Sequence, residues 1–459
     1  METIQEHQAI DSAAVARGER AGSDGDSVPC VSQLSTLLGA VPLGVGSGEL
    51  IDQIRGLEDL KWAVTGLQAR AAVALDLAQR REQTVAGVPA SEQGQGVAAQ
   101  LAFARRESPN RGSRLLGLAK ALVTEMPRTL AALESGQLSE WRANLLVRET
   151  AGLSAEDRCA VDEELAPDAG TFEGAGDKAI IAAAKAAAYR RDPRSVAQRA
   201  SHAATERTVT LRPAPDAMTY LTALLPVAQG VAVYAALTRK ADSARSGGDS
   251  RTRGQVMADT FVERITGRRG GISGVDLEVI MTDRTLLQGD AEPARIKGYG
   301  IVPAAWARGL VGAGGAAATG GGPAPKQDEE FAVWLRRLYT APSTGDLITM
   351  DSKARLFPPR LRRFIEVRDD TCRTPYCDAP IRHIDHVVPW RSGGTTTVDN
   401  SAGLCEACNQ TKENPGWTAK QVVEDVHTLE VGTPTGHSYR SSAPPLPGHV
   451  RRPPSPVGT

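Results

Sequence analysis

The chain has 459 residues, of which 53 are basic and 54 acidic, and its formal net charge is -1. Apolar residues make up 41% and charged residues 23%, a balance that excludes extensive disorder and favours two or three folded domains. The near-zero charge gives no argument for nucleic-acid binding by the chain as a whole. No stretch approaches the roughly 18 apolar residues that a membrane helix needs, so no membrane association is expected.

The amino-terminal segment 1–47 is rich in Gly, Ser, Asp and Glu without periodicity, and we predict a disordered tail there. It lacks the basic start and the apolar run of a secretion signal, so a cytoplasmic location is the default expectation. From Glu49 onward, apolar residues recur at spacings of three and four, which predicts one long amphipathic helix. Further helices are predicted in the windows 97–107, 112–124, 138–150, 154–165, 176–189 and 194–206.

The hydrophobic period changes after residue 206. Two short runs, at 208–211 and 218–221, flank a Pro-Ala-Pro-Asp turn and predict a hairpin. Beyond it we predict helices at 226–243 and 252–267, a strand at 275–281, a flexible Gly/Ala-rich loop at 309–326 and a short helix at 329–339. The predicted organisation is a mainly α-helical domain with a few short strands over 48–340, a small second domain over 341–440, and an unpacked Pro-rich tail over 441–459.

Four of the six cysteines form two close pairs near the carboxyl end. Each pair can form a knuckle around one metal ion, and four thiolates in a tetrahedral array are typical of structural Zn²⁺. The alternatives are unrelated buried thiols or redox pairs, but the paired close spacing favours zinc. The cluster consists of Cys372, Cys377, Cys405 and Cys408, whereas Cys30 and Cys159 are isolated and are expected to be ordinary thiols.

The polar residues that accompany the cysteine pairs are more than a zinc knuckle needs. Asp385 places a hard oxygen ligand next to His386, whose imidazole titrates near neutrality, and Asn409 offers an amide oxygen suited to Mg²⁺. A base that activates water and a hard divalent cation are the combination that phosphodiester hydrolysis requires. A lone Asp–His pair is more often a surface hydrogen bond, but its position inside the cysteine-framed loop favours a catalytic role.

The two cysteine pairs, the Asp-His pair and the two asparagines together resemble the motif of the HNH, or ββα-metal, nuclease family. The resemblance implies a small zinc-braced ββα-metal domain, so that the whole chain is of the α+β class, and it implies DNA as the substrate. It implies that Asp385 and Asn409 bind a catalytic Mg²⁺ or Mn²⁺. It further implies that His386 is the general base and that Asn400 holds the connecting loop and orients the histidine. Lys412, one turn beyond the last asparagine, is expected to contact phosphate.

Two positions depart from the residues that are commonest in this family, and a third has a separate expected role. Asn409 stands where many members have His, which favours oxygen ligation and hence Mg²⁺ or Mn²⁺. Ser401 stands where Leu is commoner, which leaves the packing of the loop onto the hairpin open. His383 is expected to have a structural or phosphate-contacting role rather than a catalytic one.

A second resemblance covers the region upstream. Stretches at 301–306, 335–339 and 360–369 are similar to an actinobacterial repeat family, 13E12-like, in which a helical domain of unknown function (DUF222) precedes the HNH module. This likeness extends over roughly residues 45 to 440 and assigns no activity to the helical domain.

A basic run immediately precedes the first cysteine pair. Its side chains could hold a phosphate backbone, with binding that weakens steeply as salt rises. They could equally form a solvated helix face, because Glu366, Asp369 and Asp370 are interleaved, and the sequence leaves both readings open. We expect Arg360 and Arg363 to be nucleic-acid contacts. The run comprises Lys353, Arg355, Arg360, Arg362, Arg363 and Arg368.

The sequence therefore predicts a metal-dependent HNH endonuclease that cuts DNA, with a structural Zn²⁺ and a catalytic Mg²⁺ or Mn²⁺. Two alternatives belong to other functional classes. The first is a zinc-braced DNA-binding protein that cleaves weakly or not at all. The second is an interaction protein in which the helical domain does the work and the nuclease module is accessory.

Overall fold

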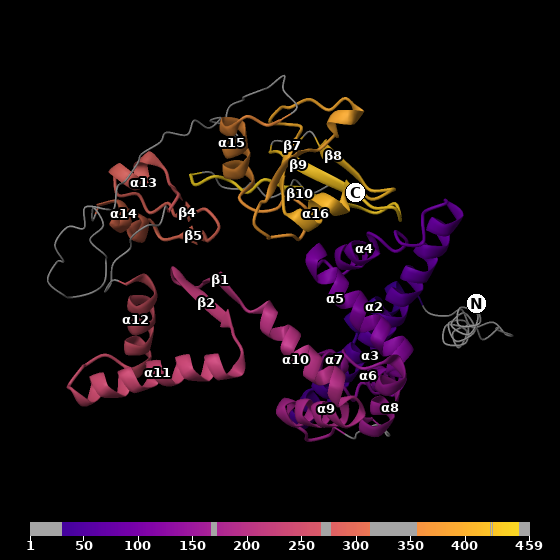
Figure 1. Ribbon diagram of the computed structural model, residues 1–459. Coiled ribbons are helices and arrows are strands. Elements are labelled where there is room, and N and C mark those ends of the chain that lie inside the picture. Colours follow the sequence, from indigo (N-terminus) through magenta and orange to yellow (C-terminus); the bar gives the residue numbers. More distant parts are fainter. Residues whose placement is uncertain are drawn as a thin grey trace. The chain divides into compact units, whose positions relative to one another are not determined.

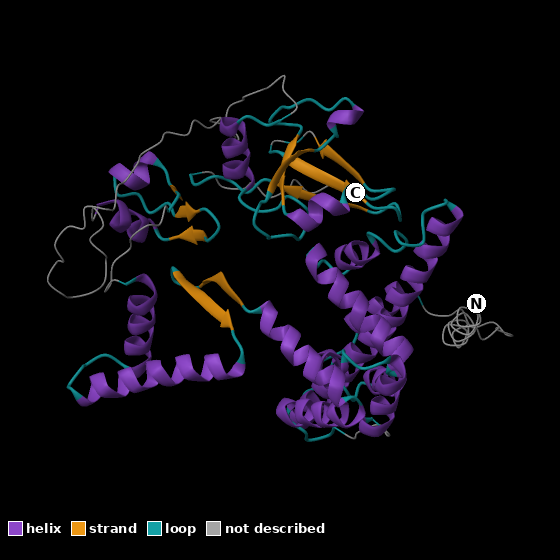
Figure 2. Cartoon of the chain, viewed as in Figure 1, coloured by secondary structure: helices purple, strands orange, loops and turns teal. Residues whose placement is uncertain are grey.

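The computed structural model describes residues 30–166, 172–267, 277–312, 356–422, 424 and 426–448. The chain divides into two compact units, residues 1–200 and residues 201–459. Figures 1 and 2 show that the described part of the first unit is built of helices, whereas helices and short strands alternate in the second. The predicted combination of a helical amino-terminal region with a small carboxyl-terminal domain is confirmed. No helix in the described ranges combines the length and the apolar character that crossing a membrane requires.

The first unit confirms most of the predicted helices. It adds α6, which was not predicted, and α2, which lies inside the segment expected to be a disordered tail. Several of its helices begin at a Ser or Pro, residues that are favoured at helix starts. The helices are α2 (Val31–Gly39), α3 (Ser47–Val85), α4 (Val97–Ala104), α5 (Pro109–Lys120), the π-helical turn η2 (Ala121–Glu125), α6 (Pro127–Glu134), α7 (Glu140–Thr150), α8 (Ala155–Leu165), α9 (Asp177–Arg191) and α10 (Pro193–Ala203), which crosses the boundary between the units.

The core of the first unit is built mainly from Ala and Leu side chains, which allows the helices to approach closely. The buried residues of α3 lie in its carboxyl-terminal half, from Gly66 onward, and Trp62 packs against the core just before them. At the crossing of α4 and α5, a Cβ atom on Gly112 would lie 2.0 Å from the carbonyl oxygen of Ala98. The absence of a side chain at position 112 therefore permits this crossing. Buried core members include Val73, Leu116, Leu122, Leu133, Leu146 and Ile180.

A carboxylate from one helix caps the start of another in this unit. Asp162 of α8 accepts hydrogen bonds from the backbone N–H of Arg128 (2.7 Å) and of Thr129 (3.0 Å) at the start of α6, and from the Thr129 hydroxyl. Burial raises the pKa of Asp162, while the bonds from Thr129 and Arg128 oppose that shift. The first turn of α6 thus obtains its capping group from α8.

The second unit begins with the predicted hairpin. The ribbon of β1 (Thr208–Ala214) and β2 (Met218–Leu224) is antiparallel, with Leu211 opposite Leu221. The hydroxyl of Tyr299 donates to the carbonyl oxygens of Ala214 (3.0 Å) and Met218 (2.9 Å) beside the turn. The elements that follow are α11 (Val227–Ser246), α12 (Arg253–Thr266), β3 (Val279–Ile280), α13 (Asp283–Leu287), β4 (Ala294–Ile296), β5 (Gly300–Val302) and α14 (Ala304–Gly312), preceded by η3 (Ala204–Glu206).

The carboxyl-terminal module holds two separate sheets. One is the antiparallel pair β6–β7, and the other has the order β10-β9-β8. Residues 441–448, expected to belong to an unpacked tail, are partly packed: β10 ends at Ser442, and both Ala443 and Leu446 are buried. The elements of the module are α15 (Pro359–Asp369), β6 (His383–His386), η4 (Trp390–Ser392), β7 (Ser401–Leu404), α16 (Glu406–Thr411), β8 (Thr418–Val422), β9 (Thr428–Gly432) and β10 (Ser438–Ser442).

Contacts join the segments on either side of the domain border expected near residue 340. Arg295 of β4 donates to the carbonyl oxygen of Val367 in α15, and Lys297 forms an ion pair with Glu366 at 2.5 Å. The sheet of β3, β4 and β5 therefore packs with α15 as part of one unit. Of the expected loop at 309–326, the first four residues end α14, and the rest lies outside the described residues, as does the helix expected at 329–339.

Candidate functional site

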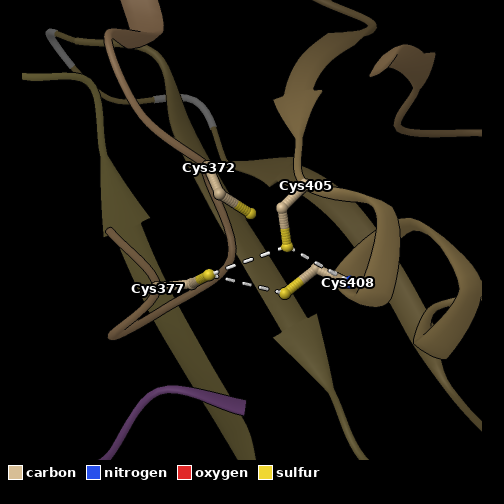
Figure 3. Close-up of side chains that lie close together, drawn as sticks. All are labelled: Cys372, Cys377, Cys405 and Cys408. Atoms are coloured by element: carbon tan, nitrogen blue, oxygen red, sulfur yellow. Dashed lines mark hydrogen bonds between the residues drawn. The ribbon is translucent and has the colours of Figure 1, made fainter. Parts of the chain in front are cut away.

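The four clustered cysteines converge on one point (Figure 3). Their sulfur atoms all lie within 4.8 Å of one another and all four residues are buried. The Sγ of Cys377 lies 3.9 Å from that of Cys405 and 3.7 Å from that of Cys408. A tetrahedral ion with metal–sulfur bonds of about 2.3 Å places its ligands roughly 3.8 Å apart. The spacing of the sulfurs therefore fits a single tetrahedral metal ion.

Local backbone structure brings the two cysteine pairs together. The first pair lies on a knuckle before β6, where Tyr376 adopts a positive φ of 61° and Cys377 N–H donates to the Thr374 carbonyl at 3.0 Å. In the second pair, Cys405 caps the start of α16 and its sulfur accepts from the N–H of Cys408 at 3.5 Å. Because β7 ends immediately before this cap, the strand pairing sets the distance between the knuckles.

Contacts among the thiols shift their pKa values in opposite directions. Hydrogen bonds with Cys372 first, and then with Cys377 and Cys408, lower the pKa of Cys405, because neighbouring S–H groups stabilise its thiolate. Contacts with the same cluster, again with Cys372 first, raise the pKa of Cys408. The first thiolate opposes further ionisation, and a bound divalent cation removes that penalty.

The Asp-His pair lies on β6, beside α16. In the β6–β7 register Asp385 is opposite Ala402, and its Oδ1 accepts from the backbone N–H of His386 at 2.8 Å. Its Oδ2 lies 2.9 Å from the ammonium of Lys412, directly after α16. On α16 itself, the Oδ1 of Asn409 is buried and has no hydrogen-bond partner among the described residues. The site thus offers a carboxylate and an unsatisfied amide oxygen on two neighbouring elements.

The imidazole of His386 is enclosed by side chains from three segments. Its Nε2 lies 2.9 Å from the hydroxyl oxygen of Thr396, and its Nδ1 lies 3.9 Å from Oδ1 of Asp385. The ring centroid is 4.6 Å from that of Phe357, just before α15, and 5.8 Å from that of Trp390. Only 7% of His386 is exposed, so its ring orientation is determined by packing.

Asn400 lies in the loop that connects β6 to β7 and is hydrogen-bonded to that loop. Its Oδ1 accepts from the N–H of Val388 at 2.7 Å, and its Nδ2 donates to the carbonyl oxygens of Val388 (3.1 Å) and Thr395 (2.8 Å). A Cβ on Gly394 would lie 1.8 Å from the Val388 carbonyl oxygen, so the loop closes tightly around the amide. Ser401, the position with the less common residue, is fully buried and donates to Val398.

A buried charge cluster supports the hairpin from α15. Arg368 donates to both carboxylate oxygens of Asp369 and to the carbonyl oxygens of Val398 and Ser401. Asp369 in turn accepts from the N–H of Gly403 in β7 at 2.7 Å. Arg368 therefore differs from the expectation of a phosphate-binding surface residue: its guanidinium binds protein atoms inside the fold.

Three other residues expected to contact nucleic acid, Arg360, Arg363 and His383, lie at the surface. Arg360 is exposed at the start of α15, and His383 is exposed at the start of β6. Arg363 is half-exposed and pairs with Glu278 at 2.9 Å. Lys412 is mostly buried in its pair with Asp385. Lys353 and Arg355 lie outside the described residues.

Three residues of the site were missed by the reasoning from sequence. Thr396 and Phe357 contact the His386 ring, and Asp369 anchors β7. Thr396 stands in a run of three threonines, any of which could have faced solvent. Phe357 and Asp369 lie outside the motif, and a sequence pattern does not reveal which apolar or acidic residue folds back onto it.

Comparison with known proteins assigns the family. The model described as "Domain of unknown function (DUF222)" matches residues 61–369, more than half of the chain. The chain belongs to the DUF222 family. In this DUF222 protein, residues 372–415 also match the model described as HNH endonuclease, and that range contains the four cysteines and the Asp-His pair. The site therefore belongs to a nuclease family.

Part of the chain is also similar to a CRISPR-associated endonuclease. The DUF222 protein is 33% identical over 85 residues to the CRISPR-associated endonuclease Cas9 of Corynebacterium diphtheriae. The aligned part is 17% of this chain and 8% of that protein, so the chain spans a small fraction of the relative's length. No solved structure matches.

Proposed function

We propose that this DUF222 protein is a metal-dependent endonuclease that hydrolyses phosphodiester bonds in DNA. The observation that carries the proposal is the Asp385–His386 pair on β6 together with α16, which packs against β6 and carries the unsatisfied amide oxygen of Asn409. All three lie in the range that matches the HNH endonuclease family. The name of the Cas9 relative, an endonuclease, supports the same activity.

The donor set fits a hard divalent cation. The amide oxygen of Asn409 is buried without a hydrogen bond in the described structure, which costs free energy unless a ligand satisfies it. The carboxylate of Asp385 is the second oxygen donor, and in the present structure Lys412 neutralises it. Such oxygen ligands suit Mg²⁺ or Mn²⁺, and the bound cation would supply charge stabilisation to the phosphorane and to the leaving oxygen.

Two protein side chains, those of His386 and Lys412, perform the remaining roles. His386 accepts a proton from water, and the oxygen of that water forms a bond to phosphorus as the bond from phosphorus to the 3′ oxygen breaks. The 3′ oxygen takes a proton from solvent, and the phosphate stays on the 5′ side. Lys412, once released from Asp385, is placed to bind a phosphate oxygen.

We assign the tetrathiolate site to a structural Zn²⁺. The buried thiols and their tetrahedral spacing support this assignment, because soft thiolate ligands select zinc over magnesium. A closed set of four protein ligands leaves no open position for substrate, so this ion holds the fold and takes no part in the reaction.

Plasmid nicking tests the proposal. Purified protein that contains zinc should convert supercoiled plasmid to the nicked form when Mg²⁺ is added. His386→Ala should lower that rate by about 100-fold or more, the usual worth of a general base. His437→Ala is the matched control, because His437 is exposed beyond β9 and should cleave like the unaltered chain. Equal nicking by both variants, or DNA binding without nicking by the unaltered protein, would contradict the proposed activity.

A further inference from the structure

The short turn η4, which follows β6 along the chain, carries two exposed side chains, those of Trp390 and Arg391. The ring centroid of Trp390 lies 5.8 Å from that of His386, and the two ring planes meet at 55°, so the rings are not stacked in parallel. Trp390 remains 41% exposed. Part of a flat aromatic surface is therefore open to solvent next to the histidine.

A chain of ion pairs connects Arg391 to the same site. Its Nη2 lies 2.7 Å from Oε2 of Glu413, and 76% of the arginine side chain is exposed. Oε1 of Glu413 lies 2.5 Å from the ammonium of Lys412, which in turn lies 2.9 Å from Oδ2 of Asp385. An exposed ion pair contributes little to stability, so a phosphate can compete with Glu413 for the guanidinium. The cation of η4 is thus connected to the proposed metal-binding carboxylate.

The backbone that carries η4 is held in place before any ligand binds. Both backbone groups of Val388 are hydrogen-bonded to the side chain of Asn400. The carbonyl oxygen of Pro389 accepts from the N–H of Ser392 at 2.8 Å, which closes the turn. A ligand that binds to the two exposed side chains of η4 therefore has little loop entropy to overcome.

We propose that Trp390 and Arg391 are substrate-binding residues: the indole stacks on an unpaired base next to the scissile phosphate, and the guanidinium binds a phosphate oxygen of the same strand. The substrate class is then DNA with unpaired nucleotides, such as a single strand or an opened duplex. This inference rests on the proposed nuclease function. An aromatic ring and a cation on one turn are the combination that binds single-stranded nucleic acid without regard to sequence.

The indole, rather than the guanidinium, determines which form of DNA is favoured. An arginine binds the phosphates of single strands and duplexes alike. Stacking requires an uncovered base face, and in a paired duplex the neighbouring base pairs cover those faces. The free energy of stacking on Trp390 is therefore gained only with a base that has left its pair.

Binding to a labelled oligonucleotide tests the inference without cleavage. The full, zinc-loaded chain, without added divalent cation, is titrated into a single strand and into the duplex of the same sequence, and fluorescence anisotropy gives both Kd values. For Trp390→Leu we expect Kd for the single strand to rise about 10-fold to 100-fold, the usual loss of one stacked base, and Kd for the duplex to change by less than about 3-fold. Trp390→Phe keeps an aromatic face and should recover most of the affinity.

Trp141→Leu is the matched control, because Trp141 is exposed on α7 of the first unit and should bind both DNAs like the unaltered chain. Unchanged single-strand binding in Trp390→Leu would overturn the inference. So would an equal rise of both Kd values, because a general disturbance of the loop affects the two DNAs alike.

The salt dependence of binding tests the guanidinium. Arg391→Gln should lower the slope of log Kd against log salt concentration for the single strand by about 0.7, the value for one phosphate contact. Arg440→Gln is the control, since Arg440 is exposed on β10 and paired with Glu424 and Glu430. An unchanged slope in Arg391→Gln would overturn the phosphate contact.

Cleavage of a duplex with a central run of mismatches tests the substrate class in the reaction. With Mg²⁺, kcat/KM for the mismatched duplex should exceed that for the paired duplex by about 10-fold or more, and Trp390→Leu should remove the difference. A chain that cuts neither duplex but binds single strands through Trp390 contradicts the nuclease function and supports the contact. A chain that cuts both duplexes equally supports the nuclease function and overturns the preference for unpaired nucleotides.

Discussion

The side chain of Asn400 binds both backbone groups of Val388, accepting from its N–H and donating to its carbonyl oxygen. The amide thereby takes the place of a paired strand residue at the point where β6 has ended. A third bond, to the Thr395 carbonyl, closes the loop on its other side. An amide is the one side-chain group that supplies an acceptor and two donors together, so this position requires Asn or its longer homologue.

Asn400→Asp should loosen this loop. The carboxylate keeps the acceptor for Val388 N–H but places a negative charge against the carbonyl oxygens of Val388 and Thr395. We expect the free energy of unfolding of the second unit to fall by about 1 kcal/mol, the usual net worth of a hydrogen bond, because Asn400 is only partly buried. Urea unfolding followed by circular dichroism measures the change. Asp399→Asn, an exposed neighbour, is the control, and an equal loss there would refute this reading.

Asn409→Ala should abolish stabilisation by Mg²⁺ without harming the cation-free protein. Substitution removes an amide oxygen that has no partner among the described residues, so the melting temperature in the absence of Mg²⁺ should stay equal or rise. Added Mg²⁺ should raise the melting temperature of the unaltered chain by mass action but not that of the variant. Gln410→Ala, exposed on the same helix, should respond like the unaltered chain. An unchanged Mg²⁺ response in Asn409→Ala would remove this residue from the cation site.

Cys408→Ser should eliminate the bound zinc and unfold the carboxyl-terminal module. A structural zinc contributes its binding free energy to folding, and the loss of one of four thiolates weakens the ion greatly. Metal analysis should give one zinc for the unaltered chain and none for the variant, and heat unfolding of the module should move to lower temperature. Cys159→Ser, on α8 of the first unit, should retain zinc. Full zinc occupancy in Cys408→Ser would argue against the tetrathiolate assignment.

The stability of the second unit should depend on pH through His427. Burial first, and then the charge of Arg368, lower the pKa of His427 from 6.5 to about 4. The unfolded chain therefore binds this proton more readily, so the contribution is complete above pH 6.5 and is lost as the pH falls toward about 4. The loss amounts to about 3 kcal/mol.

His427→Gln tests this dependence, because glutamine can donate to the Asp399 carbonyl that now lies 3.0 Å from Nε2 and does not titrate. Unfolding by urea at several pH values between 4 and 7 should give a smaller slope for the variant than for the unaltered chain. The comparison cancels the acid sensitivity of the thiolates, which both proteins share. Parallel slopes would show that His427 is protonated equally in the folded and unfolded states.

Two glycines of α5 provide a matched pair for the first unit. Alanine at position 112 would collide with the carbonyl oxygen of Ala98 across the α4–α5 crossing, at a cost of about 1–3 kcal/mol. At Gly117 the described structure leaves nothing within 4 Å of the added carbon, so Gly117→Ala should stabilise the helix by about 0.5–1 kcal/mol. Far-ultraviolet circular dichroism during urea unfolding measures both. Equal effects would mean that the close crossing does not exist in solution.

Periodicity and motif spacing predicted the long elements and the chemistry-bearing side chains. Helices such as α3 and α11 have enough turns for their apolar spacing to be recognised, and the turn after Ala214 identified the hairpin. The cysteine pairs were also predictable, because a metal-binding knuckle is a local structure. These features share one property: the residues that determine them are close together in the sequence.

The features that were missed depend on residues distant in the sequence. Helix α6 is short, and its start is capped by Asp162 from α8, so no local pattern marks it. The border expected near residue 340 is bridged by Arg295, whose partner Val367 is far along the chain. Strand β10 carries Ser and Arg residues rather than apolar ones, and only its pairing with β9 identifies it.

The bonds of Asp369 have a consequence for how this molecule can be rebuilt or exchanged. The DUF222 match ends at this aspartate, yet its carboxylate is bound to Arg368 on one side and to the N–H of Gly403 on the other. A gene fusion cut between the two matched ranges would leave the acid on one fragment and the strand that it anchors on the other. A chimaeric protein that contains the cysteine-framed module therefore also needs α15. The end of the DUF222 match and the HNH match have to be transferred together.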